Sequence, residues 1–430
     1  MGIVESLLHR LPLSPAMIYL PIGYYLGPAG AGMITFSAAE HAHGLTIATE
    51  IALLISLFTV GLKARVPLSD PLWWLPLRLG VLTMVLTIAA LTAIGHWLLH
   101  LPIGAAILLA AILAPTDPIL ASDVQISDPG DRDRIRFSLS GEGGLNDGTT
   151  YPFVMLGLGL MAVPHAAAYT TMSAFPLVAW GIVAGLVSGW VMGWLIGKLV
   201  VTLRGNFKMA LGMEEFLTLG LIALSYGVAA LIGGIGFIAV FAAGVAVRSI
   251  EYDASGKTAT PSTVIGPVPI GVEVVEAATD PKKAPAYMTE TVLGFNQQLE
   301  SIAEFAMVLL IGVMLSHSGL SWEGALLGIA LFALIRPVAV MLSLAGTRTT
   351  PLQRRLMAWF GIRGVGSLFY LMFAMQYLWS ADLAQRLSSI VLTVVAMSVA
   401  LHGISATPLM DFYARRRSRL SKSLGESPEN

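Results

Sequence analysis

Five ionisable residues stand in or at the ends of otherwise apolar stretches of the sequence: Asp117, Glu142, Asp147, Arg336 and Arg363. An ionised side chain at membrane depth costs roughly 2.5 to 3.5 kcal/mol even on a lenient scale, so such groups are usually paired or functional. Three acids against two arginines leave a local charge near minus one, which one proton or one monovalent cation would neutralise. A buried carboxylate binds protons in a range where a metal ion can compete. If a cation and a proton compete for one carboxylate that opens to each side of the membrane in turn, the protein exchanges one for the other.

The segment 114–118, Ala-Pro-Thr-Asp-Pro, predicts an opened helix around Asp117. Its two prolines remove two backbone donors and clash with the preceding turn. Open backbone at membrane depth survives only where it is buried in protein or lines a polar cavity. The Thr116 carbonyl is then a candidate cation ligand, and Asp117 can offset the positive ends of half-helices. A merely kinked helix with a capping Asp is the alternative.

Glu142 and Asp147 fall on different faces of one predicted helix. At 100° per residue, Asp147 points about 140° away from Glu142, whereas Asn146 shares the Glu142 face. The two carboxylates therefore serve different purposes: one is neutralised structurally, and the other faces an aqueous cavity. Three further acids, Glu50, Glu300 and Glu304, lie nearer the ends of apolar segments and are predicted to be interfacial.

A second interruption surrounds the two buried arginines. Arg336 precedes Pro337, and Arg363 lies in the glycine-rich segment 361–366, where glycines permit an unwound helix. This segment lies in the fourth of the last five predicted spans, and Asp117 lies in the fourth of the first five. Paired interruptions in corresponding positions indicate inverted repeats with a substrate site where they meet.

The elements that position these groups must be membrane spans. Of 430 residues, 56% are hydrophobic and only 12% are charged, against about 25% charged in soluble domains. A bilayer core needs about 20 apolar residues in a helix. We therefore predict an all-α polytopic membrane protein of twelve spans, with thirteen as the alternative count, at 13–32, 45–62, 72–98, 102–122, 142–163, 175–197, 213–231, 234–249, 299–316, 322–346, 355–377 and 387–411.

Basic residues favour this count with both termini in the cytoplasm, because Lys and Arg accumulate on that side. All but four of the 25 basic residues then fall in inner segments; the exceptions are Arg78, Arg336, Arg363 and Arg386. The transmembrane domain covers 1–411, interrupted by a long polar cytoplasmic loop at 250–298, and 412–430 form a short basic tail. No signal peptide is evident, and the first span acts as its own insertion signal.

Other classes are disfavoured by composition. The near-neutral charge argues against nucleic-acid binding, and the absence of cysteine removes thiolate metal sites and thiol nucleophiles. No cofactor is expected. One further pattern is a stripe of five glycines, each four apart, from Gly181 to Gly197. It predicts close helix packing, with a sliding surface for a moving domain as the alternative.

The residues Thr116-Asp117-Pro118, Gly141-Glu142 with Asn146-Asp147, Arg336 and Gly361 to Gly364 resemble the NhaP branch of the monovalent cation/proton antiporters, which is related to the animal sodium/proton exchangers. The resemblance extends from about the second span to the twelfth. It implies a homodimer in which a dimerisation domain flanks a mobile core containing two crossed, discontinuous helices.

By this resemblance, Asp147 binds either the cation or the proton, Asn146 supports it, and Thr116 supplies a ligand oxygen. Glu142 would form a structural ion pair with Arg336. Asp117 and Arg363 would balance the dipoles of the broken helices. Electrogenic relatives carry a second Asp where this chain has Asn146, so the resemblance implies electroneutral one-for-one exchange.

Two positions depart from the family pattern. Gly143 replaces a frequent Ser, a possible ion ligand, and Thr59 stands where several relatives have an acidic residue nearby. Both changes affect the expected ion preference.

The leading hypothesis is a transporter in a prokaryotic-type inner membrane that exchanges Na⁺, Li⁺ or K⁺ for a proton. A K⁺/H⁺ antiporter or a potassium-efflux channel is the alternative within transport, and an intramembrane aspartyl enzyme using Asp117 and Asp147 is a remote one.

Overall fold

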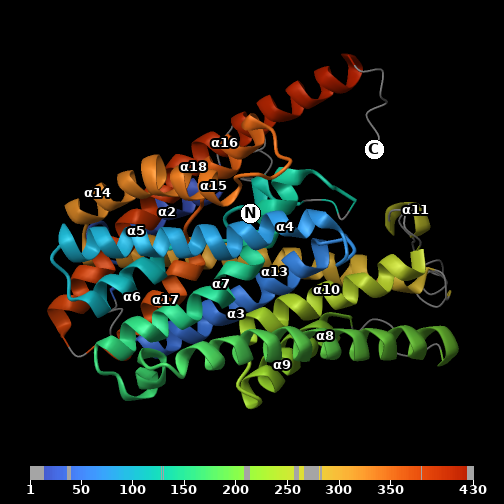
Figure 1. Cartoon of the computed structure of the whole chain (residues 1–430), viewed down its shortest axis with the longest axis horizontal. Helices are drawn as coiled ribbons and strands as arrows, with labels where there is room; N and C mark the ends of the chain where they lie inside the picture. The colour runs from blue at the N-terminus through green and yellow to red at the C-terminus, as the bar shows by residue number, and fades with distance from the viewer. Residues whose placement is uncertain are drawn as a thin grey trace.

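The computed structural model of the chain consists of helices packed side by side (Figure 1). It describes residues 14–35, 40–126, 128, 130–207, 214–255, 261–265, 280, 283–378 and 380–423. Within these residues there is no β-strand. The helices are α2 Ala16–Leu26, α3 Ala42–Lys63, η1 Pro71–Trp73, α4 Trp74–Leu77, η2 Arg78–Thr83, α5 Met84–Trp97, α6 Ile103–Leu113, η3 Ser122–Val124, α7 Arg134–Leu160, η4 Pro164–Thr170, α8 Ala174–Phe207, α9 Glu214–Leu231, α10 Gly236–Ser255, α11 Pro261–Ile265, α13 Ala284–Ser318, α14 Trp322–Ala330, η5 Leu331–Ile335, α15 Arg336–Ser343, α16 Pro351–Trp359, α17 Val365–Met375 and α18 Ala381–Ser423.

Each of the twelve predicted spans coincides with a helix or with a chain of consecutive helices, and the predicted all-α membrane fold is confirmed. Among the described residues, six segments are long and apolar enough to cross a bilayer by themselves. The spans predicted at 102–122 and 355–377 are not among them, because each is broken in the middle, as their prolines and glycines predict. α6 ends at Leu113, and α16 and α17 are separated by residues 360–364.

Several predicted boundaries were wrong. The first span is shorter than 13–32, because α2 covers only Ala16–Leu26. α7 begins at Arg134 and not at 142, since the Asp133 side chain accepts hydrogen bonds from the amides of Ile135 and Arg136 and so caps an earlier turn.

The polar loop predicted at 250–298 is also shorter, because both flanking helices extend into it. α10 continues to Ser255 and α13 begins at Ala284. Residues 256–260, 266–279, 281 and 282 lie outside the described residues. At the other end of the chain, α18 continues past the predicted limit of 411 to Ser423.

The helices form two groups. We call α2, α3, α8, α9, α10 and α13 the α10 bundle, since α10 packs on α3, α8 and α9 and α13 packs on α2 and α3. We call α4 to α7 and α14 to α18 the α7 bundle. In Figure 1 α8, α9 and α10 lie in the lower part of the view, and α14, α15 and α16 lie in the upper part. α17 packs against α3 and α10 against α7, so the two bundles meet there.

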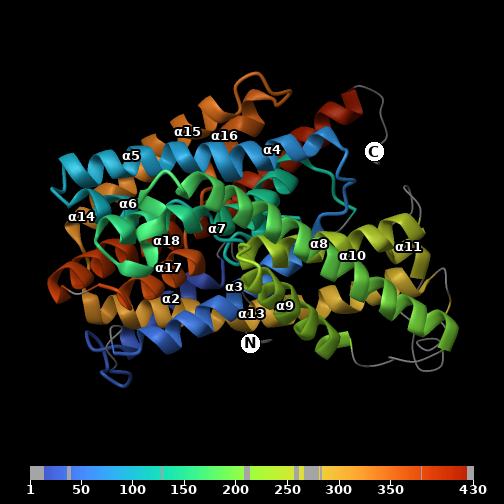
Figure 2. The same cartoon turned by 60° about the horizontal axis from the view of Figure 1, so that its bottom comes forward.

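The glycine stripe of α8 packs against α10. A methyl group at Gly189 or Gly193 would overlap the backbone carbonyls of Ala239 and Ala243, and one at Gly185 would lie 2.7 Å from the Ile235 carbonyl oxygen. Missing side chains therefore let two helices of the same bundle approach closely. The prediction of helix packing is confirmed, and the alternative of a sliding surface between moving domains is not supported. α8 and α10 run side by side in both views (Figure 2).

Candidate functional site

The two broken spans cross each other through their non-helical segments. The amide of Asp117, just beyond α6, donates a 2.8 Å hydrogen bond to the carbonyl of Ile362, between α16 and α17. One amide and one carbonyl that the two breaks leave outside helices thereby satisfy each other. α6 and α17 are largely buried on all sides, so the crossing lies inside the protein.

Asp117 lies at the beginning of α17. Its Oδ2 accepts a 2.5 Å hydrogen bond from the Val365 amide, and its Oδ1 accepts one of 2.9 Å from the Ile119 amide. The carboxylate is 1% exposed. A negative charge at a helix N-terminus is stabilised by the helix dipole.

Arg363 occupies the complementary position at the end of α6. Its Nη1 donates to the carbonyl of Ala114, the C-terminal cap of α6, where a positive charge is favourable. Its backbone amide donates a 2.7 Å hydrogen bond to Ser398 Oγ of α18. Each broken span thus supplies the charged group that stands at the helix end of the other.

Glu142 and Arg336 form a buried ion pair between α7 and α15. Both guanidinium Nη atoms donate to the carboxylate, the second at 2.9 Å, and both side chains are 2% exposed. The Arg336 Nη2 also donates to the carbonyls of Met357 and Phe360, each at 3.1 Å, at the end of α16. Glu142 is therefore neutralised by a bidentate contact.

Asp147 is fully buried, yet neither of its carboxylate oxygens has a hydrogen-bond partner in the described part of the chain. Its neighbour Asn146 donates from Nδ2 to Thr116 Oγ1 at 2.7 Å, and the Asn146 Oδ1 is also without a partner among those residues. Buried polar atoms are nearly always satisfied, so three orphaned oxygens on consecutive residues mark a site that awaits a ligand.

These oxygens fit a hard cation or a proton. Carboxylate and amide oxygens are the ligands that hard cations prefer, and a proton on Asp147 would convert one acceptor into a donor. No group of three or more His, Cys, Asp or Glu side chains gathers in the described residues to hold a transition metal. Asn146 contacts Thr116 and directly precedes Asp147 in α7, whereas Glu142 is paired with Arg336.

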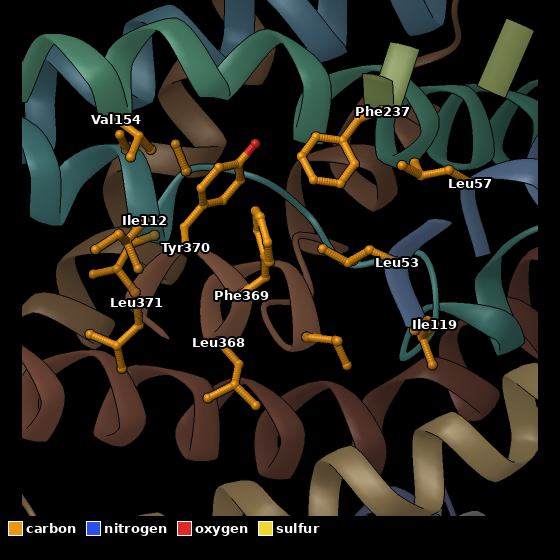
Figure 3. Close-up of a cluster of buried hydrophobic side chains, with 14 of the residues drawn as sticks. Leu53, Leu57, Ile112, Ile119, Val154, Phe237, Leu368, Phe369, Tyr370 and Leu371 are labelled. Carbon is orange, nitrogen blue, oxygen red and sulfur yellow. The ribbon is translucent and has the colours of Figure 1, made fainter. Parts of the chain in front are cut away.

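Two residues that sequence reasoning missed complete the surroundings of Asp147. Tyr370 of α17 donates from its hydroxyl to the Asp147 carbonyl, and its ring lies among the buried aromatic and aliphatic side chains of Figure 3. Gly366, one turn earlier, has no side chain; a methyl group there would lie 2.7 Å from Asp147 Oδ1. The sequence signal was weak, because glycine and tyrosine are common in apolar spans.

The two positions that depart from the family pattern have distinct surroundings. A Cβ atom on Gly143 would lie 3.2 Å from the Cβ of Pro118 and 3.6 Å from Gln125 Nε2. The Thr59 hydroxyl donates to the Ile55 carbonyl within α3 at 2.8 Å.

The predicted interfacial acids differ in their environments. Glu300 lies 3.6 Å from Lys63 Nζ, at the end of α3. Glu50 lies in the third turn of α3 and accepts a hydrogen bond from the Tyr226 hydroxyl.

A family model described as "Sodium/hydrogen exchanger, transmembrane" matches residues 1–412. The chain belongs to the sodium/hydrogen exchanger family. The predicted resemblance to cation/proton antiporters is thereby confirmed, and the protein is an integral membrane transporter and not an enzyme.

Two solved structures have the same fold as this chain. The chain superposes on the sodium/proton antiporter MjNhaP1 of Methanocaldococcus jannaschii at pH 8 with a TM-score of 0.70 and 17% identity, covering 95% of this chain and 94% of that one. An electron-microscopy structure of the same antiporter gives a TM-score of 0.66 and 18% identity, covering 95% and 93%. At this identity the likeness concerns the fold.

Proposed function

We propose that this exchanger carries a monovalent cation, Na⁺ first among them, in one direction and a proton in the other, with the two competing for Asp147. The observation that supports it best is the unpartnered Asp147 carboxylate. Glu142 is paired with Arg336, and Asp117 caps α17. Asp147 alone of these three acids lacks a hydrogen-bond donor in the described part of the chain.

Thr116, Asn146 and Asp147 would bind the dehydrated cation. In the cation-bound state the carboxylate is a negatively charged ligand, and in the proton-bound state it is neutral. Either state removes the unpaired charge, so only these two states are favourable at membrane depth. An empty carrier is disfavoured, and this couples the two fluxes.

We infer electroneutral, one-for-one exchange from the residue beside Asp147. Asn146 carries no charge and its Nδ2 already donates to Thr116, so one carboxylate titrates in each cycle. In proteoliposomes the rate should be insensitive to an imposed membrane potential. A rate that follows the potential would contradict this stoichiometry.

The decisive test is dissipation of a proton gradient by Na⁺, Li⁺ or K⁺ in proteoliposomes holding the full chain. Asp147→Asn should abolish it for all three ions. Glu323→Gln, which alters a partly exposed ion pair with Arg386, is the control and should retain it. Cation-dependent proton movement by Asp147→Asn would overturn the assignment of the site.

The family resemblance also supports a homodimer in an inner membrane with both termini in the cytoplasm. α8 offers a surface for a second copy, because only 28% of its apolar stretch is buried. This share is lower than in the other five long spans of the described residues. Cross-linking of a cysteine introduced at the exposed Val187 would test the dimer.

A further inference from the structure

Glu50 is a further acid inside an apolar span. It lies roughly 12 Å along α3 from Ala42, at a depth where a carboxylate needs compensation. In the described part of the chain its one hydrogen bond comes from the Tyr226 hydroxyl of α9, and no Lys or Arg there forms an ion pair with it. Glu50 is half-buried, and the Tyr226 hydroxyl is its hydrogen-bond donor.

The position of Glu50 is defined by its neighbours. One turn earlier, Thr46 accepts a 2.8 Å hydrogen bond from Gln376 Nε2, at the residue that caps the end of α17. Glu50 thus lies toward the end of the protein where α17 stops and α18 begins, which we call the Gln376 end. The opposite end, where α18 runs on to Ser423, we call the tail end. Glu50 is partly exposed, whereas Asp147 is fully buried.

Aromatic side chains form a continuous layer from Tyr226, beside Glu50, to Tyr370, beside Asp147. The Tyr226 ring lies 6.3 Å from that of Phe237, which lies 6.4 Å from the ring of Tyr370. Tyr370 in turn donates to the Asp147 carbonyl. Figure 3 shows Phe237 and Tyr370, with Phe369 of α17 between them.

A tyrosine stands beside each of the two acids. The Tyr226 hydroxyl donates to the Glu50 carboxylate, and the Tyr370 hydroxyl donates to the backbone carbonyl of Asp147. One phenol hydroxyl therefore lies at each acid, and no hydrogen bond joins the two carboxylates directly in the described residues. Glu50 is placed to receive an ion on the exposed side of the layer before or after Asp147 holds it.

We propose that Glu50 and Tyr226 form a second binding station for the proton or the monovalent cation, between Asp147 and the Gln376 end. The proposal rests on the proposed exchange function. The Glu50 carboxylate supplies the negative charge, and the Tyr226 hydroxyl donates to it when it is ionised and accepts from it when it is protonated. Glu50 and Tyr226 raise the local ion concentration on the Gln376-end side of the aromatic layer. The ion concentration on the tail-end side is unchanged.

The test measures each side of the membrane separately. Full-length protein with an affinity tag after Asn430 is reconstituted, and vesicles are sorted into those with the tail outside and those with it inside. Na⁺ is then varied outside only, and its half-saturating concentration for proton movement is read for each population. Glu50→Gln should raise this concentration at the Gln376 end by at least about fivefold, the lower limit of typical coupling between linked sites. At the tail end it should leave the value unchanged.

Matched variants make the test specific. Glu40→Gln removes an exposed carboxylate just before α3, and should change neither value. Tyr226→Phe keeps the ring beside Phe237 and should shift the Gln376-end value in the same direction as Glu50→Gln. Glu50→Asp should restore it in part, and these two variants carry the test if Glu50→Gln does not fold.

If Glu50→Gln and Tyr226→Phe both kept the wild-type value at the Gln376 end, the station would be overturned and the exchange function would remain intact. A wild-type protein without cation-dependent proton movement would overturn the exchange function, and the station with it.

Discussion

Gly366 of α17 faces Asp147 of α7 so closely that one added methyl group would lie 2.7 Å from the carboxylate oxygen Oδ1. No real Cβ atom approaches an oxygen this closely without displacement. The space beside Asp147 is thus reserved by the absence of a side chain on the crossing helix.

Gly366→Ala should weaken cation binding at Asp147 while leaving the fold intact. The overlap costs about 1 to 3 kcal/mol, which corresponds to roughly 5- to 150-fold in cation affinity. Half-saturating Na⁺ for proton movement measures it. Gly220→Ala, on α9 with open space around its Cα, is the matched control. Equal affinities for the two variants would contradict the close approach.

Loss of the Glu142 charge should destabilise the protein strongly. Glu142→Gln leaves Arg336 buried and unpaired, which costs about 3 to 5 kcal/mol. Thermal unfolding in detergent, followed by tryptophan fluorescence, would show the loss. Glu323→Gln breaks a pair whose side chains are 36% and 39% exposed, and should cost about 1 kcal/mol or less. Similar losses for both variants would show that the buried pair is not structural.

Substitutions of Asp117 should reduce stability in a defined order. Asp117→Asn keeps an oxygen for the Val365 amide but removes the charge at the start of α17, a loss of about 0.3 to 2 kcal/mol. Asp117→Ala also leaves that amide unpaired, for about 1 to 3 kcal/mol more. Hydrogen exchange of the first turn of α17 would report both. Asp382→Asn, at the exposed start of α18, should change little, and the reverse order would contradict the capping role.

Gly143→Ser should change ion preference, because it places a hydroxyl one helical turn before Asp147. Pro118, 3.2 Å from the new Cβ, must yield by a few tenths of an ångström. Comparison with Gly143→Ala separates the two effects, since the alanine introduces only the crowding. Tighter Na⁺ or Li⁺ binding by the serine variant alone is expected, and identical behaviour of the two variants would exclude a ligand role for the hydroxyl.

Gly189→Ala should separate α8 from α10. The added methyl group overlaps the Ala239 carbonyl, and overpacking of this kind costs about 1 to 3 kcal/mol. A lower melting temperature with an unchanged Na⁺ affinity of the folded fraction is expected. Gly227→Ala, in open space on α9, should melt like the wild type.

Apolar length and scarce charge predicted where the helices lie, and Pro115, Pro118 and the glycines of 361–366 predicted where two of them break. The start of α13 was missed for a physical reason. Its first turns carry polar residues, yet Met288 and Val292 are buried on one face, and Glu290 lies 3.3 Å from the buried Arg248. A helix whose charges are paired inside the protein has the composition of a loop.

The charged residues of the site could be found from sequence because charge is rare at membrane depth. The hydrogen-bond partners of these residues could not be found from the sequence. Arg78 donates to the carbonyls of Ser343 and Ala345 at the end of α15. Such contacts join residues far apart in the chain, and nothing local in the sequence specifies them.

The contacts that the two broken spans make with each other have a consequence for biogenesis. Asp117 accepts a hydrogen bond from the amide of Val365, and the Ala114 carbonyl accepts one from the guanidinium of Arg363. Neither broken span therefore has its partner until the last third of the chain has entered the membrane. During synthesis the first half of the chain therefore carries an opened helix whose partners have not yet been made. The crossing of the two broken spans forms only after α17 has been synthesised.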